Sequence, residues 1–372
     1  MKVAFRTDAS LTIGAGHVMR CLTLADALRK RGADCVFLSR NHAGHLHQVV
    51  EARGYPLLSF GGADPALSQK TERSYEDWLG VDQQADADDT RARLASLSVD
   101  WLVVDHYGLD ARWEQSLRPC CGQIMAIDDL ANRDHNVDVL LDQNLGKKTA
   151  DYEAKVPTSC TMMMGPRYAL LRPEFAALRA ESLSRRSQGS LRKILVTMGG
   201  VDLDDATGRV LAALKGYRFS GALEVTVVMG LNAPWRDHVT KQARHLPFPT
   251  EVLVNVGHME ALMCDADLAI GAAGTTSWER CCLGLPALQL VLAENQRPIA
   301  EALSQAGAAL QLESDALGES LHWLLDQLAC DPGLLIRMSA AAAQVTDGQG
   351  AERVTQLIKA GDKDHIQESL LA

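Results

Sequence analysis

Short apolar runs and amphipathic stretches alternate along the chain, a pattern typical of strands and helices that follow one another in turn. Runs of strand length occur in the first half at Val3–Arg6, Cys35–Ser39, Leu57–Phe60, Trp101–Asp105, Ile124–Ile127 and Val137–Leu141. Amphipathic stretches such as Val18–Arg31 and Leu46–Arg53 lie between them and predict helices. Because continuous apolar runs are typical of parallel strands buried on both faces, the pattern predicts a doubly wound α/β sheet.

The periodicity breaks off once, near the middle of the chain. Over Arg179–Arg192 serine, arginine and glycine gather and the apolar spacing is lost, so we interpret this segment as an interdomain linker. The pattern then restarts, with strand-like runs at Ile194–Met198, Glu224–Met229, Glu251–Val254, Leu268–Gly271 and Ala287–Val291. Each half opens with a strand that runs into glycines, and 372 residues are enough for two domains.

We therefore predict two Rossmann-like, doubly wound domains over residues 1–180 and 190–345 that face an interdomain cleft, followed by a C-terminal helix and tail over 346–372. Gly350–Ile358 is expected to form a helix that packs back across the domain junction. The polar segment 61–98 is expected to hold a loop and a helix over Asp86–Leu97. In such sheets ligands bind at the carboxyl ends of the strands.

Composition narrows the class of function. The formal net charge of −10 argues against a dedicated nucleic-acid binder. No apolar run is long enough for a membrane span, and the N-terminus lacks the apolar core of a signal peptide, so we expect a cytoplasmic protein. The nine cysteines are scattered without a C-x-x-C pair, which favours reduced thiols over disulfides or zinc. We expect a monomer, with the oligomeric state otherwise open.

A metal site is suggested only by the neighbouring residues His42, His45 and His47. They have no companion carboxylates or thiolates nearby, so we interpret them as a solvated loop that runs into a helix. We therefore expect neither a metal nor another cofactor.

The first glycine turn is the strongest candidate for chemistry. It contains Gly14 and Gly16, is preceded at the strand end by Asp8, and runs into a helix that begins with His17. Free backbone amides and the positive end of the helix dipole make such a turn an anion site. The dipole disfavours an imidazolium, so we expect His17 to be neutral and able to take a proton.

Two further clusters follow predicted strands of the first half. His106 and Tyr107 come directly after Asp105, and they are either ligand contacts or turn residues that pack on a neighbouring loop. Asp128 and Asp129 follow the next strand. Adjacent carboxylates point to different sides, so this pair is not an acid/base dyad. A helix or loop cap and a substrate contact both remain open for it.

The second half holds a matching set of polar and small residues. Gly199 and Gly200 follow its first strand, and Asn295 and Gln296 follow a later one. Between them, small and hydroxyl residues turn out of a strand into a helix that carries Glu279. These residues are Gly274, Thr275, Thr276 and Ser277. This turn suits phosphate, and Glu279 would accept both hydroxyls of a ribose. The alternative for Glu279 is a favourable pairing with the helix dipole.

With these residues the chain resembles the UDP-sugar hydrolases of the pseudaminic acid pathway. These are relatives of the GT-B glycosyltransferase that adds N-acetylglucosamine to the peptidoglycan lipid precursor. The resemblance covers most of residues 1–310 and is specific only as a set. It rests on the segments 5–10, 13–20, 105–108, 128–129, 168–175, 198–200 and 295–296.

The resemblance implies a GT-B fold, with His17 as general base, Tyr107 at the sugar and Asn295 in the substrate site. It also implies that the second half binds UDP through Gly199–Gly200, Gly274–Ser277 and Glu279. Two features depart from the family. Segment 61–98 and the tail beyond about Asp331 are longer than short members need, and Glu294 stands where a basic residue is expected.

The expected reaction is hydrolysis of UDP-2,4-diacetamido-2,4,6-trideoxy-β-L-altropyranose, with inversion, by a water that His17 activates. A GT-B glycosyltransferase would use the same loops, with His17 acting on an acceptor hydroxyl. A UDP-N-acetylhexosamine 2-epimerase would need a further acid or base at C2, for which the sequence offers no clear candidate. A nucleotide-sugar sensor would bind without releasing UDP. The expected partner is in each case a small nucleotide sugar.

Overall fold

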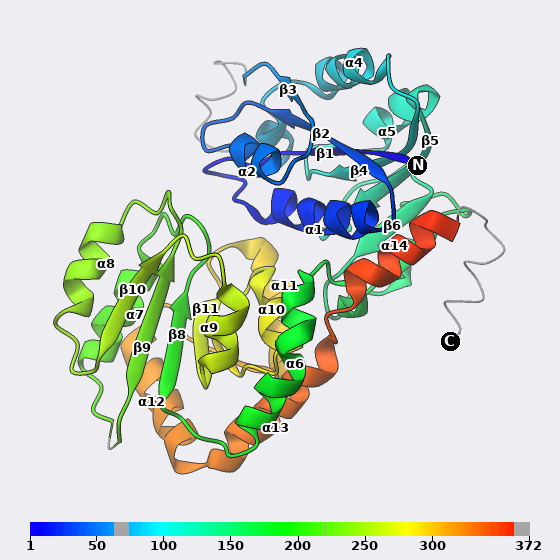
Figure 1. Cartoon of the computed structure of the whole chain (residues 1–372). Coiled ribbons are helices and arrows are strands. Elements are labelled where there is room, and N and C mark those ends of the chain that lie inside the picture. Colours follow the sequence, from blue (N-terminus) through cyan, green and yellow to red (C-terminus); the bar gives the residue numbers. More distant parts are fainter. Residues whose placement is uncertain (63–73, 220, 361–372) are drawn as a thin grey trace. The chain divides into compact units, whose positions relative to one another are not determined.

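The computed structural model describes residues 1–62, 74–219 and 221–360. The chain divides into two compact units: Met1–Leu170 with the segment that begins at Gly350, and Leu171–Gln349. Each unit is a parallel sheet with helices packed on it (Figure 1). The predicted α/β class with two doubly wound sheets is therefore confirmed.

The first unit holds a seven-stranded sheet in the order β3-β2-β1-β4-β5-β6-β7. Alternate residues of β1 enter different cores, since Val3 and Phe5 pack with α1 whereas Ala4 packs on the opposite face. The strands are β1 (Lys2–Thr7), β2 (Asp34–Arg40), β3 (Leu57–Phe60), β4 (Val99–Asp105), β5 (Cys121–Ile127), β6 (Val139–Asp142) and β7 (Thr161–Met164). The helices are α1 (Gly16–Lys30), α2 (His47–Ala52), α4 (Gln83–Leu94), α5 (Ala111–Leu117) and α14 (Gly350–Ala360), with 3₁₀ turns η1 (Glu76–Leu79), η2 (Arg118–Cys120), η3 (Thr149–Asp151) and η4 (Pro166–Tyr168).

The second unit repeats this plan with six strands in the order β10-β9-β8-β11-β12-β13. The strands are β8 (Lys193–Thr197), β9 (Glu224–Met229), β10 (Thr250–Val254), β11 (Leu268–Ala272), β12 (Ala287–Leu290) and β13 (Ala309–Gln311). The helices are α6 (Pro173–Arg186), α7 (Ala206–Lys215), α8 (Arg236–Ala243), α9 (Met259–Asp265), α10 (Thr276–Cys282), α11 (Arg297–Gln305), α12 (Leu317–Cys330) and α13 (Pro332–Val345), with the 3₁₀ turn η5 (Glu294–Gln296).

The predicted linker is wrong. Most of 179–192 lies in α6, which belongs to the second unit. Ser182 is buried and donates to the carbonyl of Leu283 (2.7 Å), and the buried Arg186 donates to the carbonyls of Met263 (2.6 Å) and Ala266 (2.8 Å). These polar side chains thus satisfy backbone groups inside the unit, which explains why the helix lacks an apolar period.

The last helix, α14, belongs to the first unit. This agrees with the prediction that the C-terminal helix packs back across the domain junction. Val354 and Ile358 of α14 are buried in the core that α1 shares, and Glu352 pairs with Arg31. The chain therefore passes between its units twice, and the boundary after Leu170 precedes the one predicted at 180–190.

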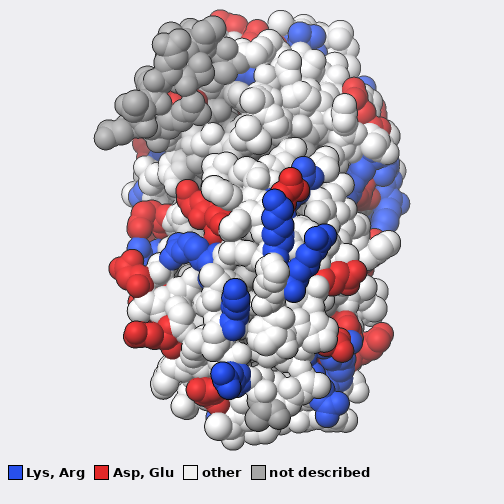
Figure 2. Space-filling model, turned by 90° about the vertical axis from the view of Figure 1, so that its left-hand side faces the viewer, with Lys and Arg blue, Asp and Glu red and all other residues white. Residues whose placement is uncertain are grey.

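The surface carries charges of both signs. On the face in Figure 2, Lys and Arg side chains lie among Asp and Glu side chains and wide neutral areas. Within the described ranges, no helix is both long and apolar enough to cross a membrane.

Candidate functional site

The turn after β1 delivers His17 to the carboxyl end of the first sheet. Gly14 has a φ of +79°, a conformation that favours glycine. Its amide donates to the carbonyl of Ser10 (2.9 Å), and the Ser10 hydroxyl accepts from the amide of Ile13 (2.9 Å). This tight turn ends at Gly16, where α1 begins, so that His17 lies on the first helical turn as predicted.

Asp105 holds His17 from the neighbouring strand. It is the last residue of β4, paired in register with Thr7 of β1, and its Oδ1 lies 2.6 Å from Nδ1 of His17. Arg20 binds both oxygens of the same carboxylate, at 2.6 and 2.7 Å. Burial alone raises the pKa of Asp105, but the charge of Arg20 and the hydrogen bonds from Arg20 and His17 outweigh burial and hold that pKa well below its usual value.

This arrangement fixes the tautomer of the imidazole. A nitrogen so close to an ionised carboxylate carries the hydrogen, so Nδ1 of neutral His17 donates and Nε2 has the free lone pair. Nε2 has no hydrogen-bond partner in the part of the chain that the structure describes, and it is accessible to solvent. Nε2 of His17 is thus available to accept a proton. The sequence analysis named Asp105 without a role, although its place at the end of an apolar strand was the available signal.

Asp129 and Tyr107 complete this group of residues. The Tyr107 hydroxyl donates to Oδ2 of Asp129 (2.8 Å), and Arg20 donates to the same oxygen (2.7 Å). The ring of Tyr107 meets the ring of His17 edge to face, with centroids 4.6 Å apart. Tyr107 is therefore beside His17, but its hydroxyl is already engaged by protein, so the predicted contact with a sugar stays a prediction.

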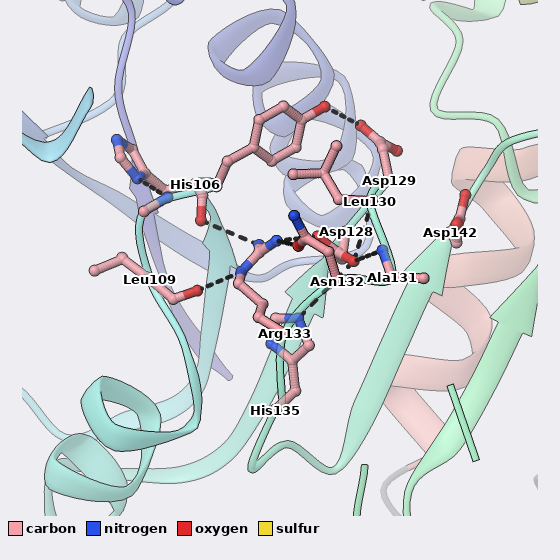
Figure 3. A network of polar contacts seen from close by, with 12 residues as sticks. His106, Leu109, Asp128, Asp129, Leu130, Ala131, Asn132, Arg133, His135 and Asp142 are labelled. Atoms are coloured by element: carbon pink, nitrogen blue, oxygen red, sulfur yellow. Dashed lines mark hydrogen bonds and ion pairs between the residues drawn. The ribbon is translucent and has the colours of Figure 1, made fainter. Parts of the chain in front are cut away.

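Asp128 points away from Asp129, as predicted for adjacent carboxylates (Figure 3). It is buried, pairs with Arg133 (2.7 Å) and accepts from the amide of Ala131 (2.9 Å). Asp128 therefore stabilises the loop after β5, which for this residue favours the cap over the substrate contact, the two alternatives that the sequence left open.

Asp8 and His106 require a correction, because their side chains are buried behind the glycine turn. Asp8 accepts from the amide of Arg40 (2.7 Å) and pairs with Arg6 (2.8 Å), and the Nε2 atoms of His42 and His106 each lie 3.5 Å from its second oxygen. These contacts leave neither side chain available to a sugar. Among the residues described here, no three His, Cys, Asp or Glu side chains are grouped so as to hold a metal ion.

The second unit brings its predicted residues to the carboxyl end of its own sheet. Gly199 and Gly200 are exposed directly after β8, and Gly199 has a φ of +94°. A Cβ atom on Gly230 would lie 1.8 Å from the carbonyl oxygen of Gly200, so the loop after β9 closely supports this turn. The start of α7 is closed to anions, because Asp202 already accepts from the amides of Ala206 and Thr207.

The turn before α10 is open instead. The amides of Gly274 and Thr275 have no acceptor among the described residues. Gln296 accepts from the amide of Leu292 (3.0 Å), which leaves its amide nitrogen close to Gly274. Asn295 is half-buried beside it, and Thr275 is exposed and Thr276 half-buried in the same turn. Ser277 differs from these residues, because its hydroxyl is buried and accepts a hydrogen bond from Arg280 (2.8 Å). The prediction that the Ser277 side chain contacts a ligand is therefore wrong.

Glu279 lies one turn into α10 with a carboxyl group that makes no hydrogen bond in the described chain. Loss of solvent raises its pKa to about 7, and the charges of Arg172 and Arg280 act in the opposite direction. Arg172 itself pairs with Glu260 (3.0 Å). Glu279 is therefore a half-buried acceptor that is free to bind a ligand.

Arg280 is buried, and its guanidinium donates to the carbonyl of Ala272 (2.8 Å) and to Ser277. It has no ion pair with a carboxylate among the described residues. Burial lowers its pKa. This cation lies at the base of the turn that holds Gly274 and supplies positive charge there in an otherwise acidic chain.

Comparisons with known proteins agree with this architecture. Residues 194–354 match the glycosyltransferase family 28 C-terminal domain. Over 215 residues the chain is 28% identical to the UDP-2,4-diacetamido-2,4,6-trideoxy-beta-L-altropyranose hydrolase of Campylobacter jejuni, covering 58% of this chain and 66% of the hydrolase. Over 368 residues it is 25% identical to the UDP-N-acetylglucosamine--N-acetylmuramyl-(pentapeptide) pyrophosphoryl-undecaprenol N-acetylglucosamine transferase of Acidothermus cellulolyticus, covering 93% of this chain and 95% of the transferase.

The chain spans only 57% to 66% of the length of three curated relatives, the hydrolase included. Among solved structures, Acinetobacter baumannii MurG is similar with a TM-score of 0.69 at 17% identity, covering 96% of this chain and 99% of that one. The chain therefore has the GT-B fold, and its residues 194–354 are similar to the glycosyltransferase family 28 C-terminal domain.

Proposed function

We propose that this protein is a UDP-sugar hydrolase that cleaves UDP-2,4-diacetamido-2,4,6-trideoxy-β-L-altropyranose into UDP and the free sugar used for pseudaminic acid synthesis. Two kinds of evidence support the substrate class. One is the likeness to the Campylobacter hydrolase. The other is the family 28 C-terminal domain, which contains the open turn before α10 and the free carboxyl of Glu279.

The observation that carries the proposal is the pairing of His17 with Asp105. In the proposed reaction Nε2 of His17 takes a proton from a water molecule while the water oxygen attacks the anomeric carbon. The bond from that carbon to the phosphate oxygen breaks, and its electron pair leaves with UDP. A single displacement inverts the anomeric configuration and needs no covalent intermediate.

The second unit is proposed to hold the leaving group. Glu279 would accept hydrogen bonds from the two ribose hydroxyls, and the amides of Gly274 and Thr275 would donate to the diphosphate. Gly199 and Gly200 line the adjacent strand end, and Arg280 adds positive charge. Donors fixed in this way stabilise the negative charge that grows on the departing phosphate. Asn295 and Gln296 are proposed to contact the sugar beside this turn.

Hydrolysis in ¹⁸O-labelled water tests both the reaction and the bond that breaks. The proposal expects the label in the sugar, and NMR spectra taken early in the reaction should show the inverted anomer. Label found in UDP would mean attack at phosphorus and would rule out the role given to His17.

A glycosyltransferase that uses a UDP-sugar donor is the second candidate, favoured by the match to the Acidothermus transferase over 93% of this chain. His17 would then take the proton from an acceptor hydroxyl in place of water. Incubation of the UDP-sugar without an acceptor separates the two candidates. Complete release of UDP supports the hydrolase, and release only after an acceptor is added supports the transferase.

A further inference from the structure

Two aromatic rings from the polar segment 61–98 pack on the ring that contacts the proposed base. The ring of Trp78 stacks on that of Tyr107 at 5.6 Å, with 30° between the ring planes. Tyr75 meets Tyr107 edge to face at 5.2 Å and Trp78 at 4.9 Å. The ring of Tyr107 thus contacts His17 as well as both Tyr75 and Trp78. We call Tyr75 and Trp78 the aromatic wall.

The local sequence fixes this wall in place. Ser74 donates to the carboxylate of Asp77 through its amide (2.9 Å) and its hydroxyl (3.1 Å), which starts η1. Leu79 is buried in the core, and Gly80, with a φ of +76°, ends the turn. A Cβ atom on Gly108 would lie 2.9 Å from the carbonyl oxygen of Tyr75, so a glycine after Tyr107 is needed for this approach.

The wall is not simply part of the hydrophobic core. Both rings are half-buried, whereas the neighbouring Trp113 is 1% exposed and its indole donates to Asp86 (3.0 Å). The Tyr75 hydroxyl and the Trp78 indole N–H have no partner anywhere in the described chain and are accessible to solvent. Burial raises the pKa of Tyr75, so its hydroxyl keeps its hydrogen. Rings with free polar edges suit a ligand that has both C–H and amide groups.

We propose that Tyr75 and Trp78 bind the glycosyl group of the substrate through its methyl-bearing substituents, and that they select sugars with acetamido and 6-deoxy groups over sugars with hydroxyls. This inference rests on the proposed function, because it assigns the reacting sugar to the neighbourhood of His17. The C–H groups of an acetamido or 6-deoxy methyl pack on the ring faces, and the free N–H and O–H groups donate to an acetamido carbonyl. A sugar hydroxyl at the place of the methyl group would lose its hydrogen bonds to water and gain no equally good hydrogen-bond partner on the ring faces.

The test compares Trp78→Ala with Trp323→Ala, a control that removes an indole 61% exposed on α12. Each variant is assayed with a UDP-2,4-diacetamido-2,4,6-trideoxyhexose and with UDP-N-acetylglucosamine, and UDP binding is measured by calorimetry. For Trp78→Ala we expect kcat/KM for the first sugar to fall about tenfold, with a smaller change for the second. UDP affinity should stay unchanged, and Trp323→Ala should match the wild type. Equal losses for both sugars, or no loss, would overturn the proposal.

Conservative variants separate contact from folding. Trp78→Phe should retain more of the selectivity than Trp78→Ala, and Tyr75→Phe should lose only the contribution of the hydroxyl. If the wild type releases no UDP from any sugar, the proposed function fails while the wall is still tested. The readout is then the gain in affinity of the intact UDP-sugar over UDP, which Trp78→Ala should reduce and Trp323→Ala should not. If Trp78→Ala leaves this gain in affinity unchanged, the aromatic wall does not bind the glycosyl group.

Discussion

The carboxylate of Asp105 lies 2.6 Å from Nδ1 of His17, although 88 positions separate the two residues in the sequence. This contact orients the imidazole and keeps Nε2 free for a proton. We expect Asp105→Asn to lower kcat by about 10²–10⁴-fold, with little change in UDP affinity, because the tautomer is no longer fixed. His17→Asn should cause a similar loss, and the double variant should lose little more than either single one. Steady-state kinetics and calorimetry measure both quantities.

The control for this prediction is Asp129→Asn. It removes a partner of Arg20 and Tyr107 but leaves the pair Asp105–His17 intact. A loss for Asp129→Asn as large as that for Asp105→Asn would show that the whole polar group matters and not the orientation of His17.

Asp142 is expected to hold a proton at neutral pH. The Tyr152 hydroxyl oxygen lies 2.9 Å from a carboxylate oxygen of Asp128 and 2.9 Å from one of Asp142. The hydroxyl has a single hydrogen to donate, so one of the two carboxyl groups must carry a hydrogen and donate it to the Tyr152 oxygen. Burial, together with the charge of Asp129, raises the pKa of Asp142 to about 8. Figure 3 shows its carboxyl at the end of β6, near the loop that carries Asp129.

This raised pKa makes stability depend on pH. The unfolded carboxyl ionises near pH 4 while the folded one stays protonated to about pH 8, so the wild type loses stability as the pH rises through this range. Asp142→Asn lacks this loss, and its stability relative to the wild type should improve by about 1 kcal/mol per pH unit between pH 5 and 8. Denaturation midpoints at both pH values measure the effect, with the exposed Asp134→Asn as control. A difference that does not change with pH would contradict the proton on Asp142.

Glu279 provides a prediction on ribose recognition. Glu279→Gln should weaken UDP binding about tenfold, because a hydrogen bond to a charged acceptor contributes about 1.5–3 kcal/mol. The loss should be smaller for 2′-deoxy-UDP, which lacks one hydroxyl. Since the pKa of Glu279 is about 7, wild-type affinity should also rise between pH 6 and 8 as the carboxyl ionises. Calorimetry with the two nucleotides tests this, and equal losses for both would remove Glu279 from the ribose site.

Gly230 provides a test of the glycine loop after β8. Gly230→Ala would bring a methyl group against the carbonyl of Gly200. We expect the loop to move, UDP affinity to fall, and stability to drop by about 1–3 kcal/mol. Gly318→Ala is the matched control, because a Cβ there meets no atom within 4 Å. UDP affinity at the wild-type level in Gly230→Ala would exclude the Gly199–Gly200 turn from the nucleotide site.

The sequence was most informative where strands are buried on both faces. Such strands are continuous apolar runs, so those in the middle of each sheet were predicted to within three residues at either end. The edge strands β7 (Thr161–Met164) and β13 (Ala309–Gln311) were missed, although the edge strands β3 and β10, which are also only partly buried, were predicted. The α6 helix was missed because Ser182 and Arg186 look like linker residues until their carbonyl partners are known.

The candidate site divides in the same way. Glycine turns are local features, and the sequence placed His17, Gly199 and Gly274 at strand ends. The partner of His17 depends on the register that sets Thr7 opposite Asp105, which no local pattern encodes. Asp8 resembled a ligand contact because it follows a strand, and only its contact with Arg6 shows that it is internal.

The return of α14 to the first unit also constrains how the chain folds as it is made. Val354 and Ile358 fill the core beside α1, yet they leave the ribosome after the whole of Leu171–Gln349. The uninterrupted second unit can finish folding during synthesis, whereas the first must wait with an open groove along α1. Nascent chains stalled before Gly350 should therefore expose that groove to chaperones, and a peptide of the α14 sequence supplied in trans should close it.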